Sequence, residues 1–263
     1  ALAKLGVHGE VYLTTTAGDG AERARRAGAE SWDALVACGG DGTVNEVLGG
    51  MPDLTRPLAM LPVGTANVLA IELGLPRDPT AVAAMLAQGR TRPLAVGTAN
   101  GRRFLLFCGI GLDGAVVNRL AEVRTGTLGK RKWIGPIVHI TRHWPRYSLR
   151  ATFADGTVRD DLSTVLVTRV RDYGGVVKLP GGIEIDDPRL FAVCFRARSR
   201  TAWIWLGLRG LFHAMREGRD LEVVPTTGLT VTGTAPYQVD GDEGGMAPVT
   251  LGLASECVPF VVP

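Results

Sequence analysis

A short run of glycines between two apolar segments is the first feature of the chain that could do chemistry. Gly39-Gly40-Asp41-Gly42-Thr43 follows the apolar run 34–38 and precedes Val44-Asn45-Glu46. Glycines let the backbone turn sharply and approach a phosphate, and the amide groups at the start of the next helix point at the anion. The run therefore predicts a phosphate-binding loop. The alternative is a glycine-rich turn in which Asp41 caps the next helix.

Asp41 bears on which ion accompanies the phosphate. A carboxylate beside a phosphate is repelled unless a divalent cation lies between the two charges. If the loop binds phosphate, Asp41 therefore implies Mg²⁺.

A second turn of the same kind lies further along the chain, at Leu61-Pro62-Val63-Gly64-Thr65-Ala66-Asn67. It also follows a predicted strand and precedes a predicted helix. Two such turns at the same end of adjacent parallel strands converge on one crevice, which is where open α/β sheets bind ligands. Neither turn matches the Walker pattern or the dinucleotide G-x-G-x-x-G fingerprint, so we expect a nucleotide fold of another kind.

The pattern of predicted secondary structure that positions these turns changes near 89–93. Before this point, short apolar runs alternate with helix-like segments, which predicts a parallel sheet with helices on its faces. After it, short β-branched and aromatic runs separated by Gly, Asp and Pro predict an antiparallel sandwich or barrel, with helices near 129–147 and 201–217. The predicted strands are 10–13, 34–38, 58–61, 104–108, 148–153, 162–168, 191–195, 222–224 and 229–232, and the predicted helices of the first part are 21–29, 43–48, 67–73 and 79–87.

Composition sets broad limits on the class of protein. The 263 residues are 46% hydrophobic and 21% charged, which excludes a disordered, collagen-like or disulfide-scaffold protein. The net charge of +3 is too small to indicate nucleic-acid binding, and we expect none. The four cysteines are widely spaced within apolar runs, so we expect reduced core residues of a cytoplasmic protein.

The two turns, 39–46 and 62–67, resemble the diacylglycerol kinase catalytic-domain family, which includes bacterial lipid kinases, sphingosine kinases and ceramide kinases. Further motifs fall in the order and rough spacing that this family uses: Gly109-Ile110-Gly111-Leu112-Asp113, Tyr173-Gly174-Gly175, Ile185-Asp186-Asp187 and Gln238-Val239-Asp240-Gly241-Asp242.

The resemblance implies an α/β N-terminal domain with a Rossmann-like parallel sheet at 1–92, which binds the nucleotide. It also implies an all-β C-terminal sandwich at 93–263 with inserted helices, which binds the lipid acceptor, and an active site in the cleft between the domains. The family normally begins with a strand and a phosphate loop that this sequence does not show, so we expect a preceding segment.

The resemblance also implies ATP and Mg²⁺ and assigns particular residues to them. Asp187 would bind a structural Mg²⁺ with the main-chain oxygens of Glu184 and Arg189, although an acidic turn before a strand is the alternative. The nucleotide contacts would be Thr14, Gly39, Gly40, Asp41, Gly42, Thr43, Val44, Asn45, Glu46, Gly64, Thr65 and Asn67.

Phosphoryl transfer to an alcohol needs a carboxylate that receives the hydroxyl proton. In the family this carboxylate is the Glu of an Asp-Gly-Glu triplet, and here the triplet is Asp240-Gly241-Asp242. We expect Asp242 to be the base, although its side chain is one methylene shorter. Asp41 is the rival, and an acidic hairpin turn is the alternative without a catalytic role.

The predicted function is therefore transfer of the ATP γ-phosphate to a lipid hydroxyl, on diacylglycerol or a related glycerolipid or sphingoid base. A catalytically silent member that binds lipid or nucleotide, and an NAD kinase, are the alternatives. Cations and aromatics interleave over 130–147, which predicts transient contact with the inner membrane surface from the cytoplasm. The oligomeric state stays open, with a homodimer as one possibility.

Overall fold

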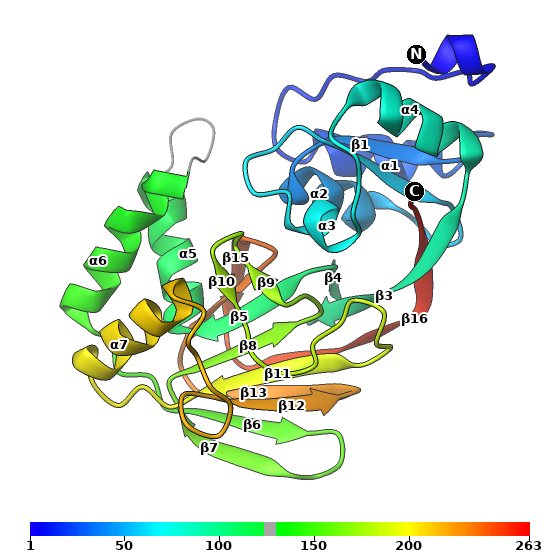
Figure 1. Ribbon diagram of the computed structural model, residues 1–263. Coiled ribbons are helices and arrows are strands. Elements are labelled where there is room, and N and C mark those ends of the chain that lie inside the picture. The colour runs from blue at the N-terminus through cyan, green and yellow to red at the C-terminus, as the bar shows by residue number, and fades with distance from the viewer. Residues whose placement is uncertain (124–129) are drawn as a thin grey trace. The chain divides into compact units, whose positions relative to one another are not determined.

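The chain forms two compact units in a computed structural model that describes residues 1–123 and 130–263 (Figure 1). Unit 1 comprises Ala1–Val96 and Ala254–Pro263, and unit 2 comprises Gly97–Leu253. The predicted division was 1–92 and 93–263, so the structure differs in giving the last ten residues, 254–263, to the first unit. We describe each unit by itself.

Unit 1 is built on parallel strands with helices around them. Strands β1 and β2 pair in parallel, with Leu35 opposite Leu58 and Gly39 opposite Pro62. Parallel neighbours need a crossover, which α2 supplies. Phe260 of β16 pairs in parallel with Leu58 and is fully buried, so the end of the chain extends this sheet. The elements are η1 Leu2–Leu5, α1 Asp19–Ala27, β1 Leu35–Gly39, α2 Asp41–Gly50, β2 Leu58–Pro62, α3 Val68–Glu72, α4 Pro79–Gln88, and parts of β3 Thr91–Ala99 and β16 Val249–Val261.

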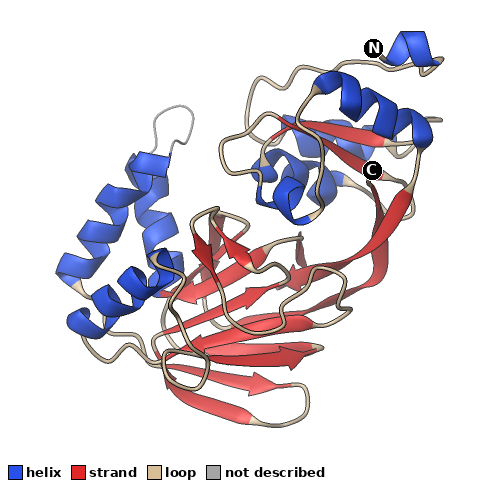
Figure 2. Cartoon of the chain, viewed as in Figure 1, coloured by secondary structure: helices blue, strands red, loops and turns tan. Residues whose placement is uncertain are grey.

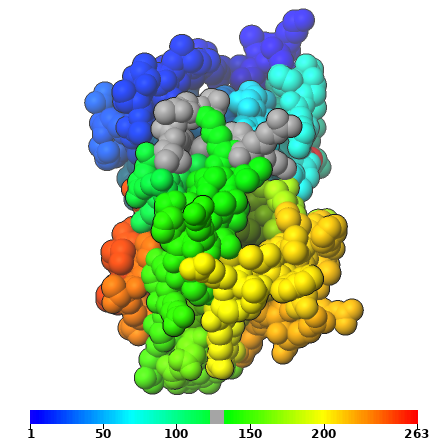
Figure 3. All heavy atoms as spheres, turned by 90° about the vertical axis from the view of Figure 1, so that its left-hand side faces the viewer, coloured from blue at the N-terminus to red at the C-terminus, as the bar shows by residue number. Residues whose placement is uncertain are grey.

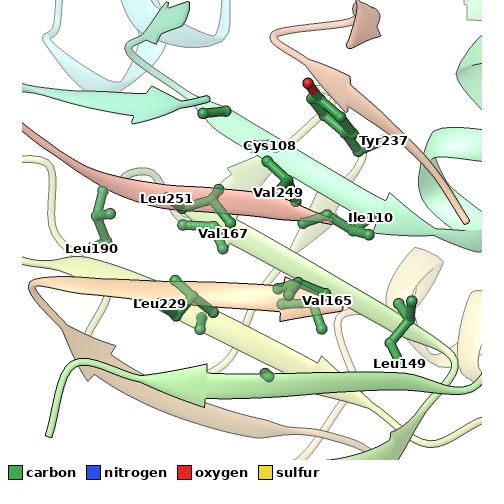
Figure 4. Packing of buried hydrophobic residues seen from close by; sticks show 14 of the residues in the cluster. Cys108, Ile110, Leu149, Val165, Val167, Leu190, Leu229, Tyr237, Val249 and Leu251 are labelled. Atoms are coloured by element: carbon green, nitrogen blue, oxygen red, sulfur yellow. The ribbon is translucent and has the colours of Figure 1, made fainter. Parts of the chain in front are cut away.

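Unit 2 is an antiparallel sandwich. One sheet has the order β12-β11-β8-β5-β14-β15, and the other includes β13 paired with both β16 and β6. Alternate residues of the two sheets point into a shared core, where Cys108, Ile110 and Val165 meet Leu229 and Leu251 (Figure 4). The strands are β4 Arg102–Phe104, β5 Phe107–Gly111, β6 Leu149–Phe153, β7 Val158–Leu162, β8 Thr164–Thr168, β9 Asp172–Tyr173, β10 Val177–Lys178, β11 Leu190–Phe195, β12 Glu222–Thr226, β13 Gly228–Thr232, β14 Pro236–Val239 and β15 Asp242–Met246.

The helices of unit 2 lie together in a group (Figure 2). A small cluster of apolar side chains packs between them. Leu112, Val116 and Ile140 form its buried centre, and Trp133 and Trp203 pack against it. The helices are α5 Leu112–Val123, η2 Lys130–Trp133, α6 Ile134–His143 and α7 Arg200–Leu211. Among the described residues, none of the helices is both long and apolar enough to cross a bilayer.

The predicted fold class, an α/β domain followed by an all-β sandwich, is confirmed, but several local predictions were wrong. Residues 10–13 form no strand, because a strand requires a pairing neighbour and none pairs with this exposed segment in the described chain. The predicted strand 104–108 is interrupted at Leu105 and Leu106, where the backbone amides turn toward Asp240. Helix α5 was not predicted as a separate element, and Gly129 of the predicted helix 129–147 lies outside the described residues.

The cysteine prediction held for only part of the set. All four cysteines are free, and Cys108 and Cys194 are buried as expected. Cys38 and Cys257 are exposed, because each stands on a face of its strand that the core does not cover.

Candidate functional site

The two glycine turns of unit 1 meet at one edge of the parallel sheet. Gly39 and Pro62 form the last paired residues of β1 and β2, so both turns leave the sheet at the same end. Beyond that point Gly40 and Gly64 are in backbone contact: a β-carbon built on Gly64 would lie 2.4 Å from the α-carbon of Gly40. The close approach explains why glycine is needed at Gly64.

Asp41 joins the two turns. Its Oδ2 accepts a hydrogen bond from the amide of Val68 at 3.0 Å, and its Oδ1 accepts one from the amide of Leu69 at 3.0 Å. These are the first amides of α3, so Asp41 caps the helix that follows the second turn. Burial raises the pKa of Asp41, and the two amide hydrogen bonds oppose that rise.

The structure therefore gives Asp41 a role different from the predicted ones. Both carboxylate oxygens accept hydrogen bonds from backbone amides, while the magnesium contact and the role of rival base stay predictions for Asp41. The alternative in which Asp41 caps a helix was correct in kind. The helix that Asp41 caps is α3, which follows the second turn, and not α2, which follows the first.

Asn67 closes the second turn. Its backbone is left-handed, with φ 48°, and its Nδ2 donates to the carbonyl of Gly64 at 2.8 Å. Asn67 Oδ1 is buried and accepts no hydrogen bond from the described residues. This leaves a buried acceptor beside the contact of Gly40 with Gly64.

Small side chains surround the start of α2. A β-carbon on Gly42 would meet no atom within 4 Å, so the backbone there is open to a ligand. The hydroxyl of Thr43 lies over Gly39, and Thr65 is exposed on the second turn. The amides of Thr43 and Val44 donate to the carbonyl of Gly40, so the open backbone at Gly42 and the threonine hydroxyls are the groups at this edge that suit an anion.

The remaining predicted nucleotide residues differ in their surroundings, and their contact with a nucleotide stays a prediction. Val44 and Asn45 are buried within unit 1. The carboxylate of Glu46 accepts a hydrogen bond from the amide of Gly18, which fixes the segment before α1. Thr14 is exposed in that segment, and no hydrogen bond among the described residues links its side chain to the turns. Helical periodicity explains the difference, because only the first turn of a helix presents its amides to a ligand.

In unit 2 the predicted catalytic loop is a tight hairpin turn. Asp240 and Gly241 both have positive φ, 48° and 89°, and connect β14 to β15. The Asp240 carboxylate accepts hydrogen bonds from the amides of Leu105, Leu106 and Phe107 at 3.0, 3.1 and 2.8 Å. The turn is therefore fixed to the start of β5.

Asp242 is the accessible carboxylate of this turn. Its side chain is 49% exposed, and Arg102 Nη2 lies 3.1 Å from its Oδ2. Arg102 Nη1 donates to the carbonyl of Glu243 at 2.9 Å, so one guanidinium group holds the side chain and the strand behind it. This leaves the other Asp242 oxygen without a hydrogen bond from the described residues.

A buried network of polar side chains also holds the turn between β14 and β15. The Tyr173 hydroxyl donates to Asp113, and Gln238 Nε2 donates to Asp113 Oδ2 at 2.9 Å. Gln238 Oε1 then accepts from the amide of Gly241 at 2.8 Å. Burial raises the pKa of Asp113, while the two hydrogen bonds oppose the rise, and burial together with Asp113 holds the pKa of Tyr173 well above its ordinary value.

The sequence alone indicated no individual role for Asp113, Tyr173, Gln238 or Arg102. The motifs Gly109–Asp113, Tyr173–Gly175 and Gln238–Asp242 did contain three of them. Gly109 contributes as well, since a β-carbon there would overlap Asp113 Oδ2. The motifs therefore contain residues that hold the turn, Asp113, Tyr173 and Gln238, as well as the exposed Asp242.

The residues predicted to bind a structural magnesium ion have hydrogen-bond partners within the protein. Asp187 is bound by the Arg189 side chain, at 2.7 Å from Nη2, and by the Arg189 amide at 2.8 Å, and this arginine lowers the pKa of Asp187 to about 2. The Glu184 carbonyl accepts from the Asp187 amide. No group of three or more metal-binding side chains occurs within 1–123 and 130–263.

A buried cation already occupies the inside of this loop. Arg169 is 1% exposed, and its guanidinium donates to the carbonyls of Ile185, Asp187 and Arg189 at 2.6, 3.0 and 3.1 Å. The Arg189 carbonyl, one of the predicted metal ligands, is thus a guanidinium acceptor. The predicted magnesium ligation by Asp187, Glu184 and Arg189 stays a prediction beside this guanidinium.

Removing the buried carboxyl group of Asp113 should change how the free energy of unfolding depends on pH. Since the folded protein keeps a proton on Asp113 at pH values where the unfolded chain has released it, Asp113 makes the free energy of unfolding fall as pH rises from 3.8 toward the raised pKa. Asp113→Asn should lack this fall. Urea unfolding at about pH 4 to 7 measures this pH dependence of the free energy of unfolding. Asp33→Asn, which removes an exposed carboxylate, is the control. Identical pH profiles for wild type and Asp113→Asn would contradict a raised pKa of Asp113.

Replacing Arg169 tests the magnesium question directly. Arg169→Met should lower the free energy of unfolding by about 3–5 kcal/mol, because three carbonyls lose a charged donor in the interior. Arg171→Met, which removes an exposed guanidinium bonded to the Leu179 carbonyl, should cost about 1 kcal/mol. Without nucleotide, the wild-type melting temperature should be equal in EDTA and in MgCl₂, and a rise with magnesium would show that a metal does bind this loop.

Comparison with known proteins places this geometry in a family. Residues 1–99 match the model of the diacylglycerol kinase catalytic domain. The chain is 30% identical over 260 residues to a diacylglycerol kinase of Bacillus subtilis, covering 92% of this chain and 82% of that protein. It is 33% identical over 260 residues to a diacylglycerol kinase of Staphylococcus aureus, covering 94% and 80%.

A solved structure has the same fold. A diacylglycerol kinase from Bacillus anthracis superposes with a TM-score of 0.73 at 23% identity, over 95% of this chain and 84% of that one. With the family model and the relatives above, the chain belongs to the diacylglycerol kinase family of lipid kinases.

Proposed function

We propose that this chain transfers the γ-phosphate of ATP to a hydroxyl group of a lipid, with diacylglycerol or a closely related glycerolipid as the acceptor. The observation that carries the proposal is the joining of two glycine turns by Asp41 at the edge of the parallel sheet. Sphingoid bases are the second acceptor class. Because ATP is cytoplasmic and the acceptor lies in a membrane, we place the enzyme at the inner membrane surface.

Unit 1 offers what the phosphates of ATP need. The exposed backbone at Gly42 and the hydroxyls of Thr43 and Thr65 provide donors at the start of α2. The buried Asn67 Oδ1 provides an acceptor for a ribose hydroxyl or for a water molecule of a hydrated ion. Magnesium bound to ATP would neutralise charge on the phosphates, and we assign no side chain of this chain to it.

Unit 2 offers a carboxylate for the acceptor hydroxyl. As the lipid oxygen forms its bond to the γ-phosphorus and the bond to the ADP oxygen breaks, Asp242 receives the hydroxyl proton. Arg102 holds one carboxylate oxygen, which fixes the direction in which the other points. The turn is held rigidly enough for this role by Asp240 and the Asp113 network.

A catalytically silent protein is the second candidate, and the ion pair of Asp242 with Arg102 is the observation that favours it. An ion pair occupies the carboxylate, and the side chain is one methylene shorter than the glutamate of the family. Incubation of the full chain with labelled ATP and a panel of diacylglycerol, sphingosine and NAD separates the candidates. Phosphate transfer to diacylglycerol supports the kinase, and ATP binding without transfer to any acceptor supports the silent protein.

Asp242→Asn tests the base. The substitution should lower kcat by about a hundredfold to ten-thousandfold while leaving ATP affinity unchanged, because only the proton acceptor is lost. Glu243→Gln is the matched control, since its carboxylate is exposed on the same strand. Equal loss in both variants, or no loss in Asp242→Asn, would remove Asp242 from the reaction.

Gly42→Ala tests the phosphate site. The protein should stay as stable as wild type, because the new methyl group meets no protein atom within 4 Å. ATP should bind at least about tenfold more weakly, because the methyl group lies where the phosphate would approach. Calorimetric titration with ATP measures this, and Gly49→Ala, another open position on α2, is the control. If both variants bind ATP equally, the phosphates do not lie at the start of α2.

A further inference from the structure

Helices α6 and α7 expose large apolar side chains on their outer faces. Their inner faces pack against α5 through Ile140 and Trp203. Outside, Ile134 is 60% exposed, Trp205 62% and Phe212 78%. The same faces carry Ile137, Val138, Ile204, Leu208 and Leu211, all exposed. Figure 3 shows α6 in green and α7 in yellow next to one another on this face, which we call the α6–α7 face. A monomeric protein seldom leaves this much apolar surface without a partner.

The charged residues within these two segments of the sequence are all of one sign. From 130 to 154 and from 196 to 216 the sequence contains Lys, Arg and His but no Asp or Glu. Arg142, Arg146 and Arg200 follow or flank the apolar residues. The side chains of Lys130 and Arg131, which the predicted basic segment included, lie outside the described side chains. A surface that is apolar, aromatic and cationic together is complementary to an anionic bilayer.

A hollow between the end of α6 and the start of α7 concentrates this charge. It has a volume of about 410 Å³ and is lined by Trp144, Arg146, Arg198, Ser199, Arg200 and Thr201. Within 1–123 and 130–263, none of its arginines forms an ion pair with a carboxylate. Guanidinium groups without a carboxylate partner bind phosphate well, because each can donate two parallel hydrogen bonds.

A second hollow beside α7 differs in this respect. It is lined by Arg196, Arg209 and Arg219, and all three lie near carboxylates: Arg209 is paired with Asp220, Arg219 lies 3.8 Å from Asp220, and Arg196 lies 3.8 Å from Glu222. Its charge is therefore partly compensated within the protein, since Asp220 and Glu222 lie beside its arginines. Of these two hollows, the one at Arg146, Arg198 and Arg200 has no carboxylate of the described residues paired with its arginines.

We propose that the α6–α7 face docks on an anionic lipid bilayer, with Trp205 and Phe212 entering the acyl boundary and a lipid phosphate headgroup held by Arg146, Arg198 and Arg200. The purpose of docking rests on the proposed lipid kinase function, but the binding itself does not. A bilayer fits better than a protein partner because the apolar rows and the cations lie on the same face, with tryptophan among them.

Vesicle binding by the full-length chain tests the proposal. Wild-type protein is sedimented with vesicles of phosphatidylcholine alone and of phosphatidylcholine with phosphatidylglycerol. It should bind the anionic vesicles and bind the neutral ones far more weakly. Arg146→Glu/Arg198→Glu/Arg200→Glu should reduce binding by about a hundredfold or more, since each basic residue near a membrane contributes about a factor of five to partitioning. Trp205→Ser/Phe212→Ser should reduce binding to both vesicle types.

The control for charge is Lys4→Glu/Arg77→Glu/Arg90→Glu, which makes the same change in net charge at exposed positions of unit 1. It should bind vesicles nearly as wild type does. If the control loses as much binding as the arginine variant, or if neither patch variant loses binding, the face does not dock on lipid. Light scattering gives a further outcome: a wild-type dimer that Trp205→Ser/Phe212→Ser converts to monomer would identify the face as a protein interface and overturn the proposal.

Activity on a short-chain diacylglycerol in detergent micelles separates this proposal from the kinase. Both patch variants should keep that activity while losing activity on vesicles. A wild-type protein that binds anionic vesicles but transfers no phosphate would leave docking intact and refute the kinase function.

Discussion

The contact of Asp41 with the first amides of α3 is the interaction on which the nucleotide side of the protein depends. It spans 27 residues of sequence and fixes the second glycine turn against the first. Without it, each turn would be an ordinary connection between a strand and a helix. With it, Gly40 and Gly64 come into backbone contact, and the start of α2 faces outward beside a buried amide oxygen.

Unit 2 also contains a carboxylate that binds backbone amides far away in the sequence. Asp240 binds three successive amides at the start of β5, and Asp113 reaches the turn through Gln238. In both units a partly or fully buried carboxylate orders the backbone, and Gly42, Thr65 and Asp242, which are proposed to meet the substrates, are exposed. The cost of burying charge is offset by amide and hydroxyl donors, which a flexible loop would otherwise present to water. Rigid loops of this kind favour transfer chemistry, because positioning provides much of the rate.

The sequence predicted what depends on local pattern. The fold class and family were confirmed, and most strands and helices of unit 1 follow from short apolar runs that end in glycine turns. It did not predict which backbone amides a carboxylate would find, because Asp41 and Asp240 bind partners 27 and more than 130 residues away. Arg169 was missed for the same reason: a single arginine directly after the apolar strand β8 gives no sign that it will bind the carbonyls of a distant loop. The strand predicted at 10–13 shows the opposite error, since favourable residues form no strand without a neighbour.

Strand β16 has a consequence for how the protein is made. Its first residues complete the sandwich, and Val258, Phe260 and Val261 fill the core of unit 1. Ribosomal synthesis delivers those residues after every residue of unit 2, so the nucleotide-binding unit, although encoded first, acquires its full core last. A nascent chain therefore carries an incomplete N-terminal sheet until all of unit 2 has been synthesised, in contrast with the usual order in which domains finish folding from the N-terminus.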